Sequence, residues 1–300
     1  MQHILISGGT GFIGKALVDH LLHHYPAAQL TVLVRSKQGL KPQDRVRYCL
    51  WDVDQAYISD EVPQDIDTVI HLAGANIAEK RWTEKRKAVL LRSRTESGAL
   101  LTRWVREKGK GVKTFVSASA IGYYGEGREG KVFTEHDAAG ADFLASVCVA
   151  WEAATQSLVA MGIRVVWIRT GLVLHPDGGM WKALAPAFSL RVAPRFASGR
   201  QIFSWISLQD LLALYAFAAE HDVVKGPLNA VSPHPAPQIT VAKVLLKNKY
   251  ERSIVVPVPK LLLNTLLGEL AIELLKSAEV SARNAEQLGF TFVKPHLSDL

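Results

Sequence analysis

Short apolar runs rich in β-branched residues alternate along the chain with longer stretches whose apolar positions recur at helical spacing. Nearly continuous apolar runs are typical of parallel strands buried on both faces, and a single apolar stripe is typical of a helix lying on a sheet. The alternation predicts an α/β fold built on a doubly wound parallel sheet. The expected strands are residues 4–6, 30–34, 46–50, 68–74, 112–117 and 165–174, and the expected helices are residues 15–24, 83–107, 142–152, 240–249 and 260–275.

A glycine-rich turn connects the first expected strand to the first expected helix. One glycine permits a tight turn, a second lets a diphosphate approach the backbone, and a third lets the helix pack on the strand. An anion there would lie at the helix N-terminus, where unpaired N–H groups and the helix dipole favour negative charge. The turn therefore predicts a dinucleotide site, with a plain glycine-rich turn as the alternative. The residues expected to contact the cofactor are Gly8, Thr10, Gly11, Phe12, Ile13 and Gly14.

The second expected strand ends in Arg35, Ser36 and Lys37, about twenty residues beyond the glycine-rich turn. An acidic residue at this position would bind the ribose 2′-hydroxyl of NAD, whereas arginine accommodates the 2′-phosphate of NADP. We therefore expect NADP as the cofactor, with Arg35 and Ser36 at its 2′-phosphate. Solvated loop cations are the alternative.

The fourth expected strand ends in Leu72, Ala73 and Gly74. Small residues at a strand end allow a ligand to approach the backbone closely, so we expect these three residues to contact the cofactor ribose. His71 lies within the apolar part of the same strand, which favours a structural role over a catalytic one.

Composition limits the kind of protein this chain can form. With 300 residues and 48% hydrophobic positions, it can bury the core of one large α/β unit, or of a domain and a lobe. The two cysteines, Cys49 and Cys148, lack metal-ligand spacing, which predicts a reducing compartment and no metal site. We expect neither a signal peptide nor a membrane span, and hence a cytoplasmic protein.

The formal net charge of +7 raises the alternative of nucleic-acid binding. The basic residues are dispersed, however, and their few clusters alternate with apolar positions of an expected helix, which is typical of a solvated helix face. We expect a small-molecule substrate and neither a nucleic-acid nor a membrane partner. A homodimer remains an open alternative.

The chain resembles the extended short-chain dehydrogenase/reductases in the Gly-x-x-Gly-x-x-Gly spacing that ends at Gly14. It is similar over almost its whole length to one atypical branch of them, whose members are commonly labelled epimerase family proteins, nucleoside-diphosphate sugar epimerases or cell-division inhibitors. The resemblance implies a Rossmann domain over residues 1–175, with later returns from about 203–231, and a substrate lobe mainly over residues 176–300. Its motifs lie at residues 76–82, 119–125, 148–152, 169–171 and 176–179.

The resemblance also implies a catalytic arrangement. Ser119 matches the residue that hydrogen-bonds the substrate oxygen, although a serine capping its own turn is the alternative. The family's proton-donating tyrosine and its lysine fall on Leu144 and Cys148, which can supply neither a proton nor a cation. Tyr123 or Tyr124 could donate the proton instead, but the sequence positions no basic group to tune either; an aromatic wall of the nicotinamide pocket is the alternative.

Four further residues are assigned by the same resemblance and by charge. Asp52 is expected against the adenine ring and Arg169 against the cofactor. Arg81 and Arg200 are expected to bind the substrate, because arginines on such a lobe can clamp a phosphate or carboxylate.

Two functional hypotheses follow. The first is an NADP-binding oxidoreductase or epimerase that acts on a small anionic carbonyl or sugar-nucleotide substrate. The second is a weakly catalytic or non-catalytic NADP(H)-binding sensor or regulator, for example of cell division. The missing proton donor separates them, because only the first requires one near the substrate oxygen.

Overall fold

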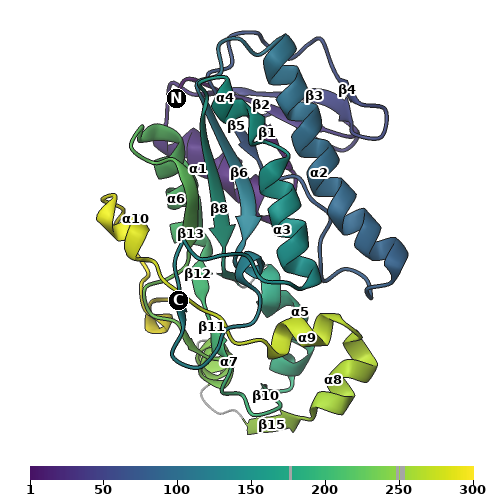
Figure 1. Cartoon of the computed structure of the whole chain (residues 1–300), viewed down its shortest axis with the longest axis vertical. Coiled ribbons are helices and arrows are strands. Elements are labelled where there is room, and N and C mark those ends of the chain that lie inside the picture. Colours follow the sequence, from purple (N-terminus) through teal and green to yellow (C-terminus); the bar gives the residue numbers. More distant parts are fainter. Residues whose placement is uncertain (176–177, 248–249, 251–253) are drawn as a thin grey trace.

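The structure, a computed structural model, describes residues 1–175, 178–247, 250 and 254–300. Its main sheet contains β1 (His3–Ser7), β2 (Gln29–Val34), β3 (Val46–Asp52), β4 (Tyr57–Ile58), β5 (Thr68–His71), β6 (Thr114–Ala120), β8 (Arg164–Thr170) and β13 (Gly226–Ala230). The order of the strands is β13-β8-β6-β5-β1-β2-β3-β4, and every neighbouring pair is parallel except β3 with β4. The predicted α/β class and its mostly parallel sheet are confirmed (Figure 1).

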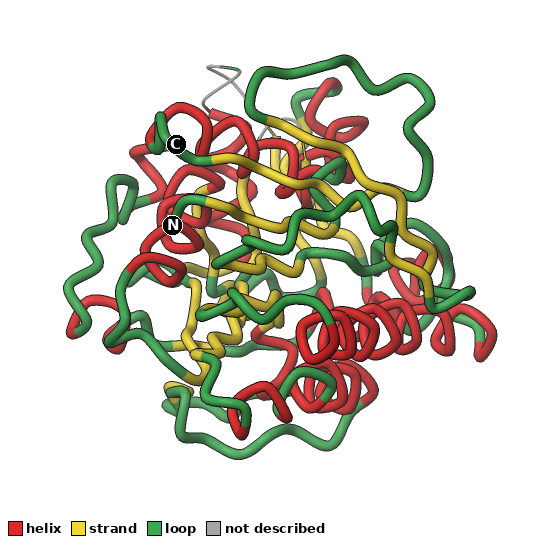
Figure 2. Tube along the Cα trace, turned by 90° about the horizontal axis from the view of Figure 1, so that it is seen from above, coloured by secondary structure: helices red, strands yellow, loops and turns green. Residues whose placement is uncertain are grey.

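Helices cover both faces of the sheet, as the views in Figures 1 and 2 show. The helices α1 (Phe12–His24) and α6 (Leu208–Glu220) lie on one face, and α2 (Glu84–Glu107), α3 (Phe143–Ala153) and α4 (Ser157–Ala160) lie on the other. Successive residues of a strand point to opposite faces. Ile4 and Ile6 accordingly join the core beneath α1 and α6, whereas Leu5 joins the core beneath α2.

A smaller lobe lies at the carboxyl edge of the sheet (Figure 1). Its helices are α5 (Gly179–Ser189), α7 (Gln238–Lys247), α8 (Lys260–Leu267) and α9 (Leu270–Leu275), whereas α10 (Arg283–Gln287) packs beside β13 of the main sheet. Its short strands form the pairs β9 (Leu172–His175) with β12 (Trp205–Ser207), β10 (Val192–Phe196) with β15 (Ile254–Val258), β11 (Ile202–Phe203) with β14 (Ala236–Pro237), and β7 (Val132–Phe133) with β16 (Glu279–Val280). The division of the chain at residue 175 stays a prediction.

Three element boundaries show how local sequence acts. The side chain of Thr83 caps α2 by accepting a hydrogen bond from the Arg86 N–H group, as expected of an N-cap threonine. The first helix begins at Phe12, three residues before the predicted start, so Gly14 lies within it. The single helix expected over residues 260–275 is broken at Gly268, whose φ of +60° ends α8.

Pro176 and Asp177, in the expected turn, and residues 248–249, at the expected end of α7, lie outside the described residues.

One helical stretch of the described chain, Phe143–Ala160, is long and apolar enough to span a membrane by length and composition alone. In the fold this stretch forms α3 and α4, which pack against α2, β6 and β8. The core helices of soluble proteins meet the same two criteria, so this property alone does not distinguish the two environments.

Candidate functional site

The glycine-rich turn forms a tight cradle at the carboxyl end of β1. Gly8 has a φ of +74°, and a Cβ atom there would lie 2.8 Å from the Ala73 nitrogen. A Cβ atom on Gly14 would lie 2.1 Å from the Gly8 carbonyl oxygen, which is far inside contact distance. Side chains are therefore excluded at both positions, and α1 can begin directly against the strand end.

The N-terminus of α1 has the chemistry of an anion site. Gly11 is its N-cap, and within the described chain no side chain caps the first turn and no acidic residue lies in it. The first backbone N–H groups of a helix need acceptors, and an anion can supply them. The cradle therefore fits a dinucleotide diphosphate, the group that its sequence predicts.

The residues expected at the adenosine end follow β2 and β3. Arg35 is exposed, and in the described parts of the chain no carboxylate pairs with it. Its neighbour Lys37 differs, because its amine lies 2.8 Å from a Glu61 carboxylate oxygen. The Ser36 hydroxyl accepts a hydrogen bond from the Gln38 N–H group, and Asp52 accepts one from Gln55 at 3.1 Å. Arg35 is thus the cation at this edge with no counter-charge among the described residues.

Leu72, Ala73 and Gly74 follow β5, which lies beside β1 in the sheet. The Leu72 N–H group bonds to the Ser7 carbonyl oxygen at 3.0 Å, which holds this segment against the glycine-rich turn. Gly74 is exposed, and a Cβ atom there would lie 3.3 Å from the side chain of Arg94 on α2. Sequence reasoning missed Arg94, because it lies among other basic residues of the helix.

A buried polar network joins β6, α3 and β8. Ser119 is 3% exposed and donates a hydrogen bond of 2.7 Å to Glu152. Arg169, also 3% exposed, pairs with both oxygens of Glu152, each at 2.9 Å. Burial alone would lower the pKa of Arg169, but the hydrogen bonds and charge of Glu152 outweigh it and raise the pKa. The guanidinium is thus held inside the protein, and its contact with a cofactor stays a prediction.

Arg169 also lies against the two tyrosines that follow β6. Its guanidinium carbon is 3.4 Å from the centroid of the Tyr123 ring and 5.2 Å from that of Tyr124. The sequence predicted no basic group near either ring. That prediction is wrong, because β8 brings Arg169 to both rings. The tyrosines precede Arg169 by more than forty residues, so only the sheet reveals the contact.

The two tyrosines differ in their hydrogen bonds. The Tyr124 hydroxyl donates to Asn229 at 2.7 Å and accepts from Arg169 at 3.1 Å, and burial raises its pKa to about 12. Tyr123 is half-buried, and its hydroxyl bonds to no residue that the structure describes. Of the two phenols, only that of Tyr123 is available to a ligand.

Leu144 and Cys148 occupy the helix positions where the extended reductases carry tyrosine and lysine. Both side chains face Gly122: a Cβ atom on that glycine would lie 3.4 Å from the Leu144 Cβ atom and 3.9 Å from the Cys148 sulfur. Burial raises the pKa of the Cys148 thiol to about 12, so it stays protonated. The usual acid–base pair is therefore replaced by an apolar contact.

The two arginines expected to bind substrate lie in different places. Arg81 is exposed and lies against the turn between α8 and α9, where its Nε atom would be 2.8 Å from a Cβ atom on Gly268. Arg200 is exposed in the loop between β10 and β11. No hydrogen bond or ion pair between described residues connects these two arginines, and their roles stay predictions.

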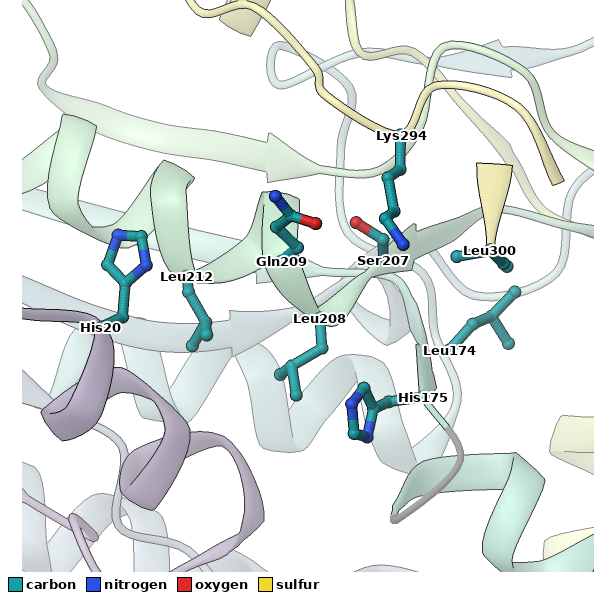
Figure 3. Close-up of a pocket in the computed structure, with 9 residues that line it drawn as sticks. All are labelled: His20, Leu174, His175, Ser207, Leu208, Gln209, Leu212, Lys294 and Leu300. Atoms are coloured by element: carbon teal, nitrogen blue, oxygen red, sulfur yellow. The ribbon is translucent and has the colours of Figure 1, made fainter. Parts of the chain in front are cut away.

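A cavity of about 300 Å³ lies between α1, α6 and the C-terminal segment (Figure 3). His20, His175 and Lys294 are among its lining residues, and none of the residues predicted from sequence lines it. The His175 ring is 5.8 Å from that of Phe12, which places the cavity next to the glycine-rich turn. Ser119 is not among the residues that line it.

In the part of the chain that the structure describes, no group of three His, Cys, Asp or Glu side chains could hold a metal ion.

Comparisons with known proteins agree with this geometry. Residues 4–230 match the NAD dependent epimerase/dehydratase family, and residues 258–299 match a domain of unknown function, DUF1731. The epimerase family protein Mb2239 of Mycobacterium bovis is 35% identical over 294 residues, which cover 96% of this chain and 93% of that protein.

Two solved structures extend the comparison. The human epimerase family protein SDR39U1, solved with NADPH, is 28% identical with a TM-score of 0.86, and the match covers 99% of this chain and 97% of that one. The UDP-glucose 4-epimerase of Thermus thermophilus, solved with NAD, is 20% identical with a TM-score of 0.77, and the match covers 99% and 96% of the two chains. The second likeness is one of fold alone.

Proposed function

The chain belongs to the NAD dependent epimerase/dehydratase family, and from that membership we propose that it binds NADP(H) and acts on a small anionic carbonyl or sugar-nucleotide substrate. The family and its fold indicate an oxidoreductase-like protein that binds a nicotinamide cofactor. The choice of NADP, the substrate class and the catalytic roles are the parts proposed here. A cytoplasmic location and the absence of a nucleic-acid or membrane partner stay predictions.

The preference for NADP is supported by Arg35. A 2′-phosphate brings negative charge to the end of β2, and Arg35 is the exposed cation there without a carboxylate partner in the described chain. The human relative solved with NADPH is similar over nearly its whole length. The relative solved with NAD is more distant and supports only the fold.

The observation that carries the catalytic proposal is the position of Ser119 and Tyr123. Both lie at or just beyond the carboxyl end of β6, which is separated from the glycine-rich turn of β1 by β5 alone. Adjacent strands lie about 4.8 Å apart, so a cofactor bound at the turn would have these side chains within one dinucleotide length. When bound, NADPH supplies a hydride.

Ser119 and Tyr123 are the residues proposed to contact the substrate oxygen. Ser119 already donates its proton to Glu152, so its oxygen can accept a hydrogen bond from a substrate hydroxyl. In the direction of carbonyl reduction, Tyr123 donates a proton to the oxygen from its hydroxyl, which no described residue engages. The Arg169 guanidinium on the Tyr123 ring stabilises negative charge that develops on the phenol.

A second function is favoured by the apolar contact of Leu144 and Cys148. A chain that packs these positions without acid–base groups could bind NADP(H) as a regulator without turnover. The nucleotide half of the proposal is common to both functions.

Turnover separates the two functions. NADPH oxidation is followed by absorbance with the wild-type chain over a panel of aldehydes, keto acids and nucleotide sugars. The enzyme proposal expects turnover with a member of the panel and a loss of about 100-fold or more in Tyr123→Phe, which removes the proton donor for carbonyl reduction. Ser146→Ala, an exposed serine on α3, is the control and keeps its rate. No turnover across the panel, with NADPH still bound, would favour the regulator.

A further inference from the structure

Arg94 of α2 is a buried cation without a counter-charge in the described chain. It is 9% exposed, and its Nη1 atom donates to the Leu90 carbonyl oxygen of its own helix at 2.9 Å. Within the residues that the structure describes, no carboxylate forms an ion pair with it. Burial lowers the pKa of Arg94, which expresses the cost of keeping its charge away from water. A position of this kind is expected to have a partner outside the chain.

A second buried donor lies beside it. The Arg94 guanidinium carbon is 4.8 Å from the centroid of the Trp151 ring, and the Trp151 Nε1 group is buried with no acceptor in the described chain. Buried N–H groups are nearly always bonded to protein, water or ligand. A buried cation without a counter-charge and a buried N–H group without an acceptor in the described chain, from two different helices, thus lie in one cluster, which favours acceptor oxygens of a ligand.

The sheet places this cluster along the path of the dinucleotide. Arg35 follows β2, the glycine-rich turn follows β1, Gly74 follows β5 and Ser119 lies on β6, and these four strands are neighbours in that order. The Arg94 side chain lies over Gly74, 3.3 Å from where a Cβ atom would be. A dinucleotide with its 2′-phosphate at Arg35 and its diphosphate at the turn therefore has its second ribose near Gly74.

We propose that Arg94 and Trp151 bind the ribose next to the nicotinamide ring, with Arg94 donating hydrogen bonds to the ribose oxygens. The inference rests on the proposed binding of NADP(H). Trp151, whose ring the Arg94 guanidinium contacts, lies on α3 three residues beyond Cys148. The cation that α3 lacks at Cys148 is therefore supplied by α2, and the cofactor can be held without the usual lysine.

Two ligands separate the halves of the cofactor. NADPH contains the second ribose, whereas 2′,5′-ADP contains the adenosine end with its 2′-phosphate and lacks that ribose. Both are titrated against the full chain by calorimetry. In Arg94→Met we expect the Kd of NADPH to rise about 10- to 100-fold, because a charge-assisted hydrogen bond is lost, and the Kd of 2′,5′-ADP to stay the same.

The melting temperature of the ligand-free protein gives an independent readout. An apolar side chain of similar length in place of an unpaired buried charge is expected to leave it unchanged or raise it. Arg92→Met is the matched control: it lies on the same helix, but Arg92 is exposed and paired with Glu96, so neither Kd should change. Arg94→Lys keeps the charge with fewer donors and should weaken NADPH less than Arg94→Met does.

The outcomes distinguish the two proposals. An unchanged Kd of NADPH in Arg94→Met, with wild-type binding intact, overturns the ribose contact and leaves the proposed function standing. Equal weakening of both ligands together with a lower melting temperature also overturns it, because Arg94 would then be structural. If Arg94→Met does not fold, Arg94→Lys decides by the same comparison. A wild-type chain that binds neither ligand overturns the proposed function and this inference together.

Discussion

Glu152 and Arg169 form a bidentate ion pair, in which Arg169 Nε lies 2.9 Å from Glu152 Oε1 and Arg169 Nη2 lies 2.9 Å from Glu152 Oε2. The same carboxylate accepts the proton of Ser119, and the same guanidinium stacks on Tyr123. The pair therefore fixes both residues that we assign to the substrate oxygen. Bidentate arginine–carboxylate geometry restricts the orientation of both groups, so the site is ordered before any ligand arrives.

Removal of Glu152 should destabilise the fold. Glu152→Ala leaves the buried Arg169 without its counter-charge, and we expect the free energy of unfolding to fall by about 3–5 kcal/mol. Urea denaturation measures this loss. Glu96→Ala, which breaks the surface pair with Arg92, is the control and should cost less than about 1 kcal/mol. Equal losses in the two variants would contradict the importance of the buried pair.

Gly14 provides a test of the cradle that is free of backbone strain. Gly14 lies within α1, where alanine would ordinarily favour the helix by about 1 kcal/mol. Here a Cβ atom would be 2.1 Å from the Gly8 carbonyl oxygen, so Gly14→Ala should instead lower the melting temperature and weaken NADPH binding. Gly130→Ala adds a Cβ atom with nothing within 4 Å, at a φ of +76°, and should leave NADPH binding unchanged. A Gly14→Ala variant that binds NADPH normally would show that the turn is not the cradle.

The features of this structure that the sequence predicted are those determined by residues close together in the chain. Strand periodicity, the glycine spacing at Gly8 and Gly14 and the Thr83 cap each depend on residues within one or two turns of each other. Such signals predicted the sheet and located the glycine-rich turn at the start of α1. The predicted start of α1, at residue 15, is too late, because glycines favour a turn in sequence-based reasoning. In the structure the backbone is already helical at Phe12.

The parts that could not be predicted are contacts across the fold. Arg169 reaches Tyr123 only because β8 lies beside β6, and Arg94 reaches Trp151 only because α2 packs on α3. In the sequence, Arg94 is one of several basic residues on a single helix. Its burial and its lack of a carboxylate among the described residues depend on tertiary packing, for which no local pattern exists.

Protonation of His71 should make the stability depend on pH. His71 is fully buried between Ser7 and Ser97, and burial lowers its pKa from 6.5 to about 4. The unfolded chain therefore binds more protons than the folded one between these values, so stability rises with pH across that window and is lost as the pH falls. Between pH 7.5 and pH 4.5 the contribution of His71 amounts to about 2–3 kcal/mol.

His71→Asn removes this titration and keeps a polar group near Ser7. Urea denaturation at pH 7.5 and at pH 4.5 should show that the wild type loses about 2–3 kcal/mol more than the variant. Comparison of the two chains cancels the other groups that titrate in this range, including His20, whose pKa is also lowered to about 4 by burial. Parallel pH profiles would mean that His71 has the same pKa in the folded and unfolded chains, and would contradict the lowered pKa.

Replacement of Arg35 should change the choice of cofactor. Arg35→Ala removes the unpaired cation at the end of β2, and we expect the Kd of NADPH to rise about 10- to 100-fold while the Kd of NADH stays the same, because only NADPH carries the 2′-phosphate. Fluorescence titration with both dinucleotides measures this. Lys37→Ala is the matched control two residues away: the Lys37 amine is already paired with Glu61, so its removal should affect NADPH far less. An equal rise in the Kd of NADPH and of NADH in Arg35→Ala, or tighter binding of NADH than of NADPH by the wild type, would show that this position does not bind the 2′-phosphate.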